Sequence, residues 1–163
     1  MLVRITEDNI SLYDAQLCTL FKEHGHEYHI NWRNENYIYV INDVVVAFAF
    51  IANAIVIQDK KYKYINKKKY EIKTKNYTKF CNDFVSTPLD CLYNLIRLPN
   101  EGYKGCGIAF IAQILAIKKV IHLATTEPRL YQYYKNAGFK ETDFFDMDTN
   151  NIYRKVLCWK QND

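Results

Sequence analysis

Three of the five glycines in this 163-residue chain lie close together, at positions 102, 105 and 107 of the stretch GYKGCGIAFI. A predicted strand, 90–98, precedes the stretch, and a predicted helix follows it. A glycine-rich turn at the start of a helix exposes unpaired N–H groups with a partial positive charge, and such turns hold phosphate groups. Gly105 and Gly107 let the backbone approach an anion, and Gly102 relaxes the turn before them. The loop therefore predicts a phosphate site, although it matches neither GxxxxGK[ST] nor GxGxxG.

The N-terminal third of the chain predicts a strand, a helix and a hairpin. Residues 2–6 read as the strand, and Asp8 or Asn9 is placed to cap a helix that stops at Gly25. Two strands then follow, joined by a tight turn at Asn42–Asp43. The second of these strands is apolar at almost every position, so we expect both its faces to be covered.

The C-terminal half continues the alternation of strands and helices. The helix after the glycine loop is apolar nearly all round, which predicts that it is buried rather than lying on the surface. A later helix opens at Pro128, where proline is tolerated, and ends before Gly138. This order of elements predicts an α/β fold with a mixed sheet. The predicted segments of this half are strands at 90–98, 120–124, 140–147 and 152–159 and helices at 108–119 and from 128.

Composition indicates a single globular domain spanning residues 1–163. Apolar residues make up 49% and charged residues 25%, and no apolar run is long enough to cross a membrane. The preference for Lys, Asn, Ile and Tyr is typical of an AT-rich genome, such as a viral one. The five cysteines show no metal-like pairing, which favours reduced thiols and a cytoplasmic location. They stand at Cys18, Cys81, Cys91, Cys106 and Cys158.

A Lys/Tyr-rich insert at about 58–80 differs from the rest of the chain. Residues 60–79 hold nine Lys and one Glu, whereas the remaining residues have thirteen Lys and Arg against seventeen acids. Lysines between Tyr62, Tyr64, Tyr70 and Tyr77 could bind phosphate backbones and stack on bases. The simpler interpretation is a solvated β-hairpin, since edge strands commonly carry lysines. Nucleic acid is therefore a possible partner that the sequence does not favour.

Two segments resemble the GCN5-related N-acetyltransferases. GYKGCGIAFI is similar to that family's pyrophosphate loop, Arg/Gln-x-x-Gly-x-Gly/Ala, with Gly105 and Gly107 at the small positions. LATTEPRLYQYYKNAGFKETDFF is similar to the next segment of the family, in which a helix ends in Tyr-x-x-x-Gly-Phe, here Tyr134, Gly138 and Phe139. The resemblance implies a mostly antiparallel central sheet with flanking helices. It also implies that the parallel strands 90–98 and 120–124 splay apart.

The same resemblance implies acetyl-CoA as the co-substrate. Gly102 stands where the family has Arg or Gln, and Lys104 could supply the charge instead. Backbone N–H groups near Ile96 and Leu98 would polarise the thioester carbonyl. The diphosphate would lie on the loop formed by Gly102, Lys104, Gly105, Cys106, Gly107 and Ile108.

The implied reaction is transfer of an acetyl group to a primary amine by direct attack. Tyr134 matches the residue that protonates the departing thiolate, although it could equally pack its helix on the sheet. Asp90 is a candidate base; a strand-end role for Asp90 and a water-relayed proton transfer are the alternatives. The sequence does not identify the amine, nor does it decide between a monomer and a homodimer. The competing hypothesis is an inactive member of the fold that binds nucleic acid or a protein through the insert.

The remaining histidines and cysteines predict no further functional site. HGHEYH places His24, His26 and His29 near one another, but only Glu27 adds a further ligand, so we expect no metal site. His122 reads as a core histidine in an apolar strand. A nucleophilic role for Cys106 is not expected.

Overall fold

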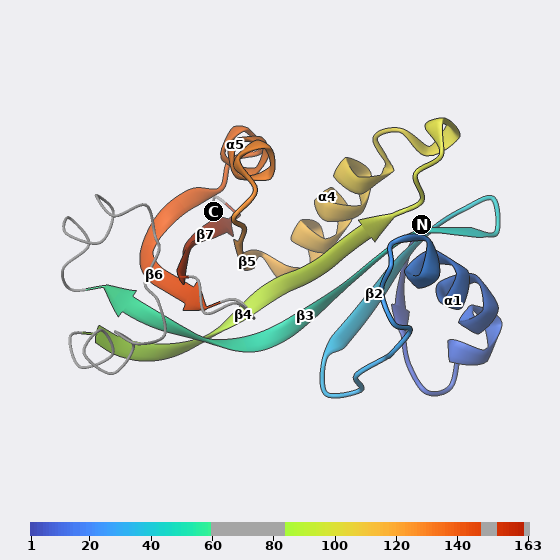
Figure 1. Ribbon diagram of the computed structural model, residues 1–163, viewed down its shortest axis with the longest axis horizontal. Helices are drawn as coiled ribbons and strands as arrows, with labels where there is room; N and C mark the ends of the chain where they lie inside the picture. Colours follow the sequence, from blue (N-terminus) through green and yellow to red (C-terminus); the bar gives the residue numbers. More distant parts are fainter. Residues whose placement is uncertain (60–83, 148–152, 162–163) are drawn as a thin grey trace. The chain divides into compact units, whose positions relative to one another are not determined.

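The computed structural model describes residues 1–59, 84–147 and 153–161, so most of the Lys/Tyr-rich insert lies outside the described residues. Within these ranges, no helix is long and apolar enough to cross a membrane. Two short 3₁₀ helices of the described residues, η1 (Ile10–Leu12) and η3 (Glu101–Tyr103), accompany the main elements. The main elements, in chain order, are β1 (Leu2–Ile5), α1 (Asp14–Glu23), β2 (Glu35–Ile41), β3 (Val44–Asp59), β4 (Phe84–Arg97), α4 (Cys106–Lys118), β5 (Val120–Ala124), α5 (Pro128–Asn136), β6 (Lys140–Met147) and β7 (Tyr153–Lys160) (Figure 1).

The strands form a seven-stranded sheet in the order β1-β2-β3-β4-β5-β7-β6. The β1–β2, β2–β3, β5–β7 and β6–β7 pairs are antiparallel. The β4–β5 pair is parallel, and its register in the described residues is a single pairing of Cys91 with His122. The prediction of a mixed, mostly antiparallel sheet with one parallel strand pair is confirmed.

The chain divides into two compact units, and the prediction of a single domain stays a prediction. The first unit comprises Met1–Ala52 and Leu92–Lys119. The second comprises Asn53–Cys91 and Val120–Asp163. Each unit is described separately below.

In the first unit, α1 and α4 pack on opposite sides of β2. Ile38 and Val40 of β2 belong to one core cluster with Leu17, Leu20 and Phe21 of α1. The neighbouring residue of β2, Tyr39, instead stacks near Phe110 of α4, with ring centroids 5.8 Å apart. Because successive side chains of a strand point to opposite faces, β2 supplies apolar contacts to both helices.

In the second unit, β5, β6 and β7 form a buried sheet core. Ile121, Leu123, Val156 and Leu157 are all at most 3% exposed. A partly buried ion pair joins β6 to β7, with Nη2 of Arg154 2.6 Å from Oδ2 of Asp146.

Several local predictions are confirmed. Asn42 and Asp43 have φ of 48° and 63°, as a two-residue hairpin turn with left-handed residues requires. Pro128 is the first residue of α5, and Gly138 follows that helix with φ of 96°. These turns depend on residue types next to each other in the chain, which is why the sequence shows them.

Two helix predictions are wrong in part. Neither Asp8 nor Asn9 caps α1, which begins at Asp14 after the 3₁₀ turn η1 (Ile10–Leu12). The Asn9 side chain instead accepts a hydrogen bond from the Thr6 N–H at 2.9 Å, and it closes the turn after β1.

The helix after the glycine loop is not buried all round, and it begins at Cys106 rather than at Ile108. Ile108 and Ile117 are 58% and 55% exposed, because only one face of α4 packs on the sheet. The buried face consists of Cys106, Phe110, Ile111, Ile114 and Leu115.

Candidate functional site

The loop between β4 and α4 closes on itself through the 3₁₀ turn η3 (Glu101–Tyr103). Oδ1 of Asn100 accepts a hydrogen bond from the Gly102 N–H at 2.8 Å. The Lys104 N–H donates to the carbonyl of Glu101 at 3.1 Å. The backbone N–H groups of Gly102 and Lys104 are therefore used within the loop, and of these two predicted residues only the exposed Lys104 side chain remains open to a ligand.

The backbone N–H groups in the first turn of α4 differ from those of the preceding loop in their hydrogen bonding. Gly105 caps the helix in the left-handed conformation, with φ of 84°, which favours glycine over any other residue. Among the described residues, no oxygen atom accepts a hydrogen bond from the N–H of Gly105, Cys106 or Gly107; the N–H groups of Cys106 and Gly107 face only the Cys106 sulfur, which is a weak acceptor. The next N–H, that of Ile108, donates to the Gly105 carbonyl at 3.1 Å. The start of α4 thus presents three consecutive N–H groups without an oxygen acceptor among the described residues, together with the partial positive charge of a 13-residue helix.

The positions that side chains would take on the two glycines of this turn are open. A Cβ built on Gly105 would meet no atom within 4 Å, and one built on Gly107 would meet only Cδ of Arg97, at an ordinary contact distance of 3.8 Å. Packing alone therefore does not require glycine at position 107. A small residue there leaves the N–H groups accessible to a group from outside the chain. The residues present fit a phosphate group bound by main-chain nitrogens.

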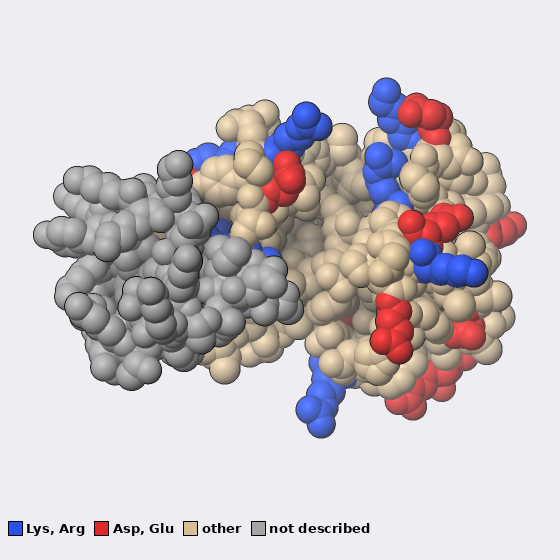
Figure 2. All heavy atoms as spheres, viewed as in Figure 1, with Lys and Arg blue, Asp and Glu red and all other residues tan. Residues whose placement is uncertain are grey.

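Arg97, the last residue of β4, is a charged neighbour of this loop that the sequence reasoning missed. Its side chain is exposed, and Nη1 donates to the carbonyl of Leu98 at 3.2 Å. Figure 2 shows basic and acidic side chains together on the surface of the region that joins β4 to α4. The only available signal was an arginine at the end of the strand before the glycines.

Cys106 is buried at the start of α4 and is 5% exposed. Burial raises the pKa of its thiol, and the nearby Arg97 guanidinium and the Gly107 N–H offset only part of that effect. A thiol held in its neutral form is a poor nucleophile. That Cys106 lines the loop rather than attacking a substrate stays a prediction.

The predicted donors on β4 need one correction. The Leu98 N–H donates to the carbonyl of Val46 at 2.8 Å, so it is not free to polarise a thioester carbonyl as predicted. Ile96 is 7% exposed, with its side chain in the core cluster, and its backbone role stays a prediction. Asn94 has φ of 50° in the middle of this strand, a conformation typical of a bulge. Sequence reasoning missed Asn94, although asparagine tolerates this region of backbone conformation better than most residues.

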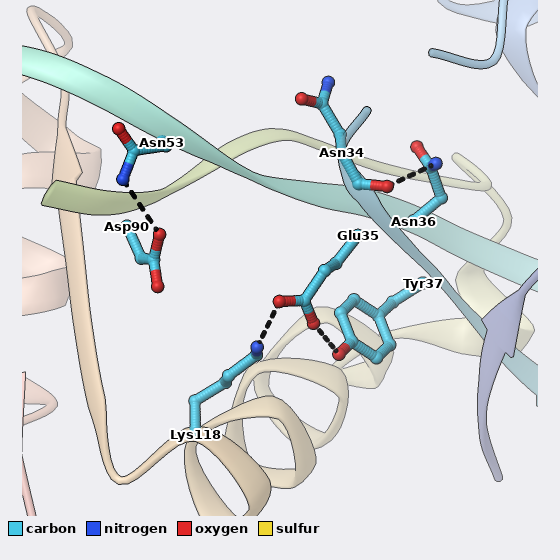
Figure 3. Close-up of polar contacts among 7 residues, drawn as sticks. All are labelled: Asn34, Glu35, Asn36, Tyr37, Asn53, Asp90 and Lys118. Carbon is cyan, nitrogen blue, oxygen red and sulfur yellow. Dashed lines mark hydrogen bonds and ion pairs between the residues drawn. The ribbon is translucent and has the colours of Figure 1, made fainter. Parts of the chain in front are cut away.

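In the second unit, Asp90 lies exposed on β4. Oδ1 of Asp90 accepts a hydrogen bond from Nδ2 of Asn53 on β3 at 3.4 Å (Figure 3). His122 on β5 is half-buried, rather than enclosed in a core as expected. Its burial lowers the pKa of the imidazole, and a hydrogen bond to the Asp90 backbone and the Asp90 charge offset part of that effect. Asp90 and His122 thus form a pair of titratable groups at the point where β4 and β5 meet.

Tyr134 of α5 is buried between two aromatic rings. Its ring packs edge-on against Phe139, with centroids 5.5 Å apart, and against Tyr133 at 5.2 Å. Burial, followed by the influence of Tyr133, raises the pKa of Tyr134 to about 12. Its hydroxyl has no hydrogen-bond partner among the described residues, yet it is not one of the fully enclosed unpartnered atoms. Tyr134 therefore combines a packing role with a hydroxyl that remains a candidate proton donor.

The three clustered histidines show no sign of a metal site. Within residues 1–59, 84–147 and 153–161, no group of three or more His, Cys, Asp or Glu is arranged to hold a metal ion. Nδ1 of His24 lies 2.9 Å from the Leu20 carbonyl of α1, a local contact at the helix end.

At the level of sequence, no protein-family model matches the chain, and no curated protein matches it either. Solved structures do match. The aminoglycoside 6'-N-acetyltransferase from Enterococcus faecium is 13% identical, with 100% of this chain and 99% of that chain covered and a TM-score of 0.56.

Two further structures are similar over nearly their whole length. The ribosomal-protein-S18-alanine N-acetyltransferase from Escherichia coli is 12% identical, covers 98% of this chain and 92% of its own, and has a TM-score of 0.54. The loading GNATL domain of CurA from Lyngbya majuscula is 10% identical, covers 98% and 96%, and has a TM-score of 0.53. At these identities, the similarity concerns the fold.

Proposed function

Because the chain has the fold of the GCN5-related N-acetyltransferases, we propose that it is an N-acyltransferase that moves an acetyl group from acetyl-CoA to a primary amine. One observation carries the proposal. The N–H groups of Gly105, Cys106 and Gly107 have no oxygen acceptor among the described residues, and the side-chain positions of the two glycines at the start of the helix are not crowded by other atoms. This arrangement suits the diphosphate of coenzyme A.

The proposed chemistry is a direct attack on a thioester. The amine nitrogen forms a bond to the acyl carbon while the carbon–sulfur bond breaks. The amine gives its proton to a base, and the departing thiolate takes a proton from an acid. No covalent enzyme intermediate is needed, which agrees with a buried, neutral Cys106 thiol.

Two side chains are proposed for the proton transfers. Asp90 is exposed and carries a carboxylate, so it can accept the amine proton directly or through a water molecule. Tyr134 is the proposed acid for the thiolate. With its pKa raised to about 12, the hydroxyl stays protonated throughout the physiological range and always has a proton to give.

The acceptor is proposed only as a class. The names of two similar structures specify acetyl transfer to nitrogen, on an aminoglycoside in one protein and on an alanine of ribosomal protein S18 in the other. Both an aminoglycoside and an alanine-containing peptide therefore belong in a first screen.

The test is binding followed by turnover. Acetyl-CoA at about a hundred times its Kd should stabilise the folded protein by about 2.7 kcal/mol. A panel of amines should then be screened by release of free thiol from acetyl-CoA. The absence of any thermal shift at millimolar acetyl-CoA would overturn the proposal. A salt-sensitive gel shift with DNA or RNA in the same preparation would support the competing binding module instead.

A further inference from the structure

The glycine loop lacks a charged side chain at the place where a diphosphate would need one. Position 102 is glycine, and the N–H groups of Gly102 and Lys104 are used inside the loop. What remains is the three backbone donors at the start of α4 that have no oxygen acceptor among the described residues. Backbone donors carry only partial charges, whereas a diphosphate carries at least two full negative charges.

Arg97 lies beside those three donors. Its Cδ lies 3.8 Å from the position that a Cβ would take on Gly107. Its charge also reaches the Cys106 thiol, whose pKa it lowers against the effect of burial. The position of Cδ thus places this side chain at the first turn of α4, and its effect on the Cys106 thiol agrees with that position.

The Arg97 guanidinium is also available. Among the residues that the structure describes, no carboxylate forms an ion pair with it. One of its five N–H donors is accounted for by the Leu98 carbonyl, and this contact holds the group near the loop. A guanidinium with free donors in a fixed fork is the side chain best matched to phosphate oxygens.

We infer that Arg97 binds the diphosphate of the acyl-CoA substrate and replaces the side-chain contact that the loop lacks at Gly102. The inference rests on the proposed function, since it concerns the same substrate. This role would also explain why position 107 holds a glycine, because a larger side chain there would push the Arg97 side chain away from the N–H groups.

Lys104 is the natural comparison. It is exposed and lies on the same loop, and the sequence alone made it the candidate for the missing charge. No contact among the described residues brings its ammonium group to the first turn of α4, whereas the position of Cδ places the Arg97 side chain there.

The experiment compares R97A, R97K and K104A with the wild type by calorimetric titration with acetyl-CoA and by competition with ADP, which carries the same diphosphate. Arg97 is exposed, so the melting temperatures of all four proteins should agree. R97A should weaken both ligands by the same factor, about tenfold or more, and R97K by less. K104A should weaken them less than R97A does, by no more than about threefold, as expected for a solvent-exposed charge without a fixed contact.

The outcomes separate the two proposals. If the wild type binds no acetyl-CoA, the proposed function fails. If the wild type binds and R97A binds equally well, Arg97 is not a ligand contact and the inference fails. A loss for acetyl-CoA without a loss for ADP, or a larger loss in K104A than in R97A, would also overturn it.

Discussion

Nζ of Lys118, at the end of α4, lies 2.6 Å from Oε1 of Glu35, the first residue of β2 (Figure 3). The other carboxylate oxygen of Glu35 accepts a hydrogen bond from the Tyr37 hydroxyl at 2.7 Å. Both side chains of the ion pair are at least two-thirds buried, at 21% and 32% exposed. The C-terminal end of α4 is therefore fastened to the sheet of its unit, while its N-terminal end carries the glycine loop.

The first prediction concerns this ion pair. E35Q and K118M should each lower the free energy of unfolding by about 1 kcal/mol, since each leaves a partly buried charged or polar partner unsatisfied. The double variant E35Q/K118M should lose less than the sum of the two, which a double-mutant cycle by urea denaturation would detect. Strict additivity of the two losses would show that the pair contributes nothing.

The pH dependence of the same pair follows from the pKa of Glu35. Burial alone would raise that pKa, but the hydrogen bonds from Lys118 and Tyr37 outweigh burial and lower it below its ordinary 4.5. The stability gained is present above pH 4.5 and is lost as pH falls through the folded-state pKa. The difference in stability between the wild type and E35Q should therefore shrink steadily as unfolding is measured at lower pH.

The second prediction separates the two loop glycines. Gly105 needs a positive φ, so G105A should destabilise the protein by about 1–2 kcal/mol. Gly107 lies inside α4 at an ordinary helical position, so G107A should leave stability unchanged or raise it by up to about 1 kcal/mol. G107A should nevertheless weaken acetyl-CoA binding, because its methyl group occupies the space beside the N–H groups at the start of α4. Thermal unfolding and titration of both variants would check this contrast. Undiminished affinity in a stable G107A would count against a bound diphosphate there.

Turn and helix-end preferences of residues that are neighbours in the sequence predicted much of the fold. The hairpin turn at Asn42–Asp43, the start of α5 at Pro128 and its stop at Gly138 all depend on local backbone preferences, and they are confirmed. The pattern of apolar residues predicted the positions of the strands, because alternating or continuous apolar runs indicate which side chains are buried.

What the sequence could not show depends on partners far along the chain. The buried face of α4 could not be told from its exposed face, because both carry isoleucine, as at Ile114 and Ile117. The Leu98 N–H was predicted to be free, yet its acceptor, the Val46 carbonyl, lies on another strand. An arginine at the end of a strand is visible in the sequence, but the path of the Arg97 side chain past Gly107 is not.

The third prediction concerns His122. Burial lowers its pKa below 6.5, so the unfolded chain takes up a proton at this imidazole before the folded chain does. The corresponding stability is present above pH 6.5 and is lost as pH falls through the folded-state pKa. The melting temperature should therefore fall less between pH 7.5 and 5 in H122Q than in the wild type. H26Q, which changes an exposed histidine, serves as the control and should behave as the wild type. Identical curves for H122Q and the wild type would remove His122 as a source of acid sensitivity.

The last prediction tests Tyr134 as the acid. Y134F removes only the hydroxyl, which has no hydrogen-bond partner among the described residues, and it keeps the ring that packs on Phe139. The variant should therefore fold normally and bind acetyl-CoA as the wild type does. Its kcat should fall by about 10²–10⁴-fold, the usual contribution of a general acid. Since the pKa of Tyr134 is about 12, the defect should be the same across the neutral pH range.

The neighbouring Tyr133 provides the matched control for this test. Tyr133 is half-buried on the same helix and packs edge-on against Tyr134, so Y133F removes an equivalent hydroxyl one position away. Y133F should keep nearly full kcat, and both variants should show wild-type affinity for acetyl-CoA in titration. If Y134F and Y133F turn over equally fast, the Tyr134 hydroxyl takes no part in the reaction. The thiolate must then be protonated by another group or by water, and Tyr134 has only its packing role in α5.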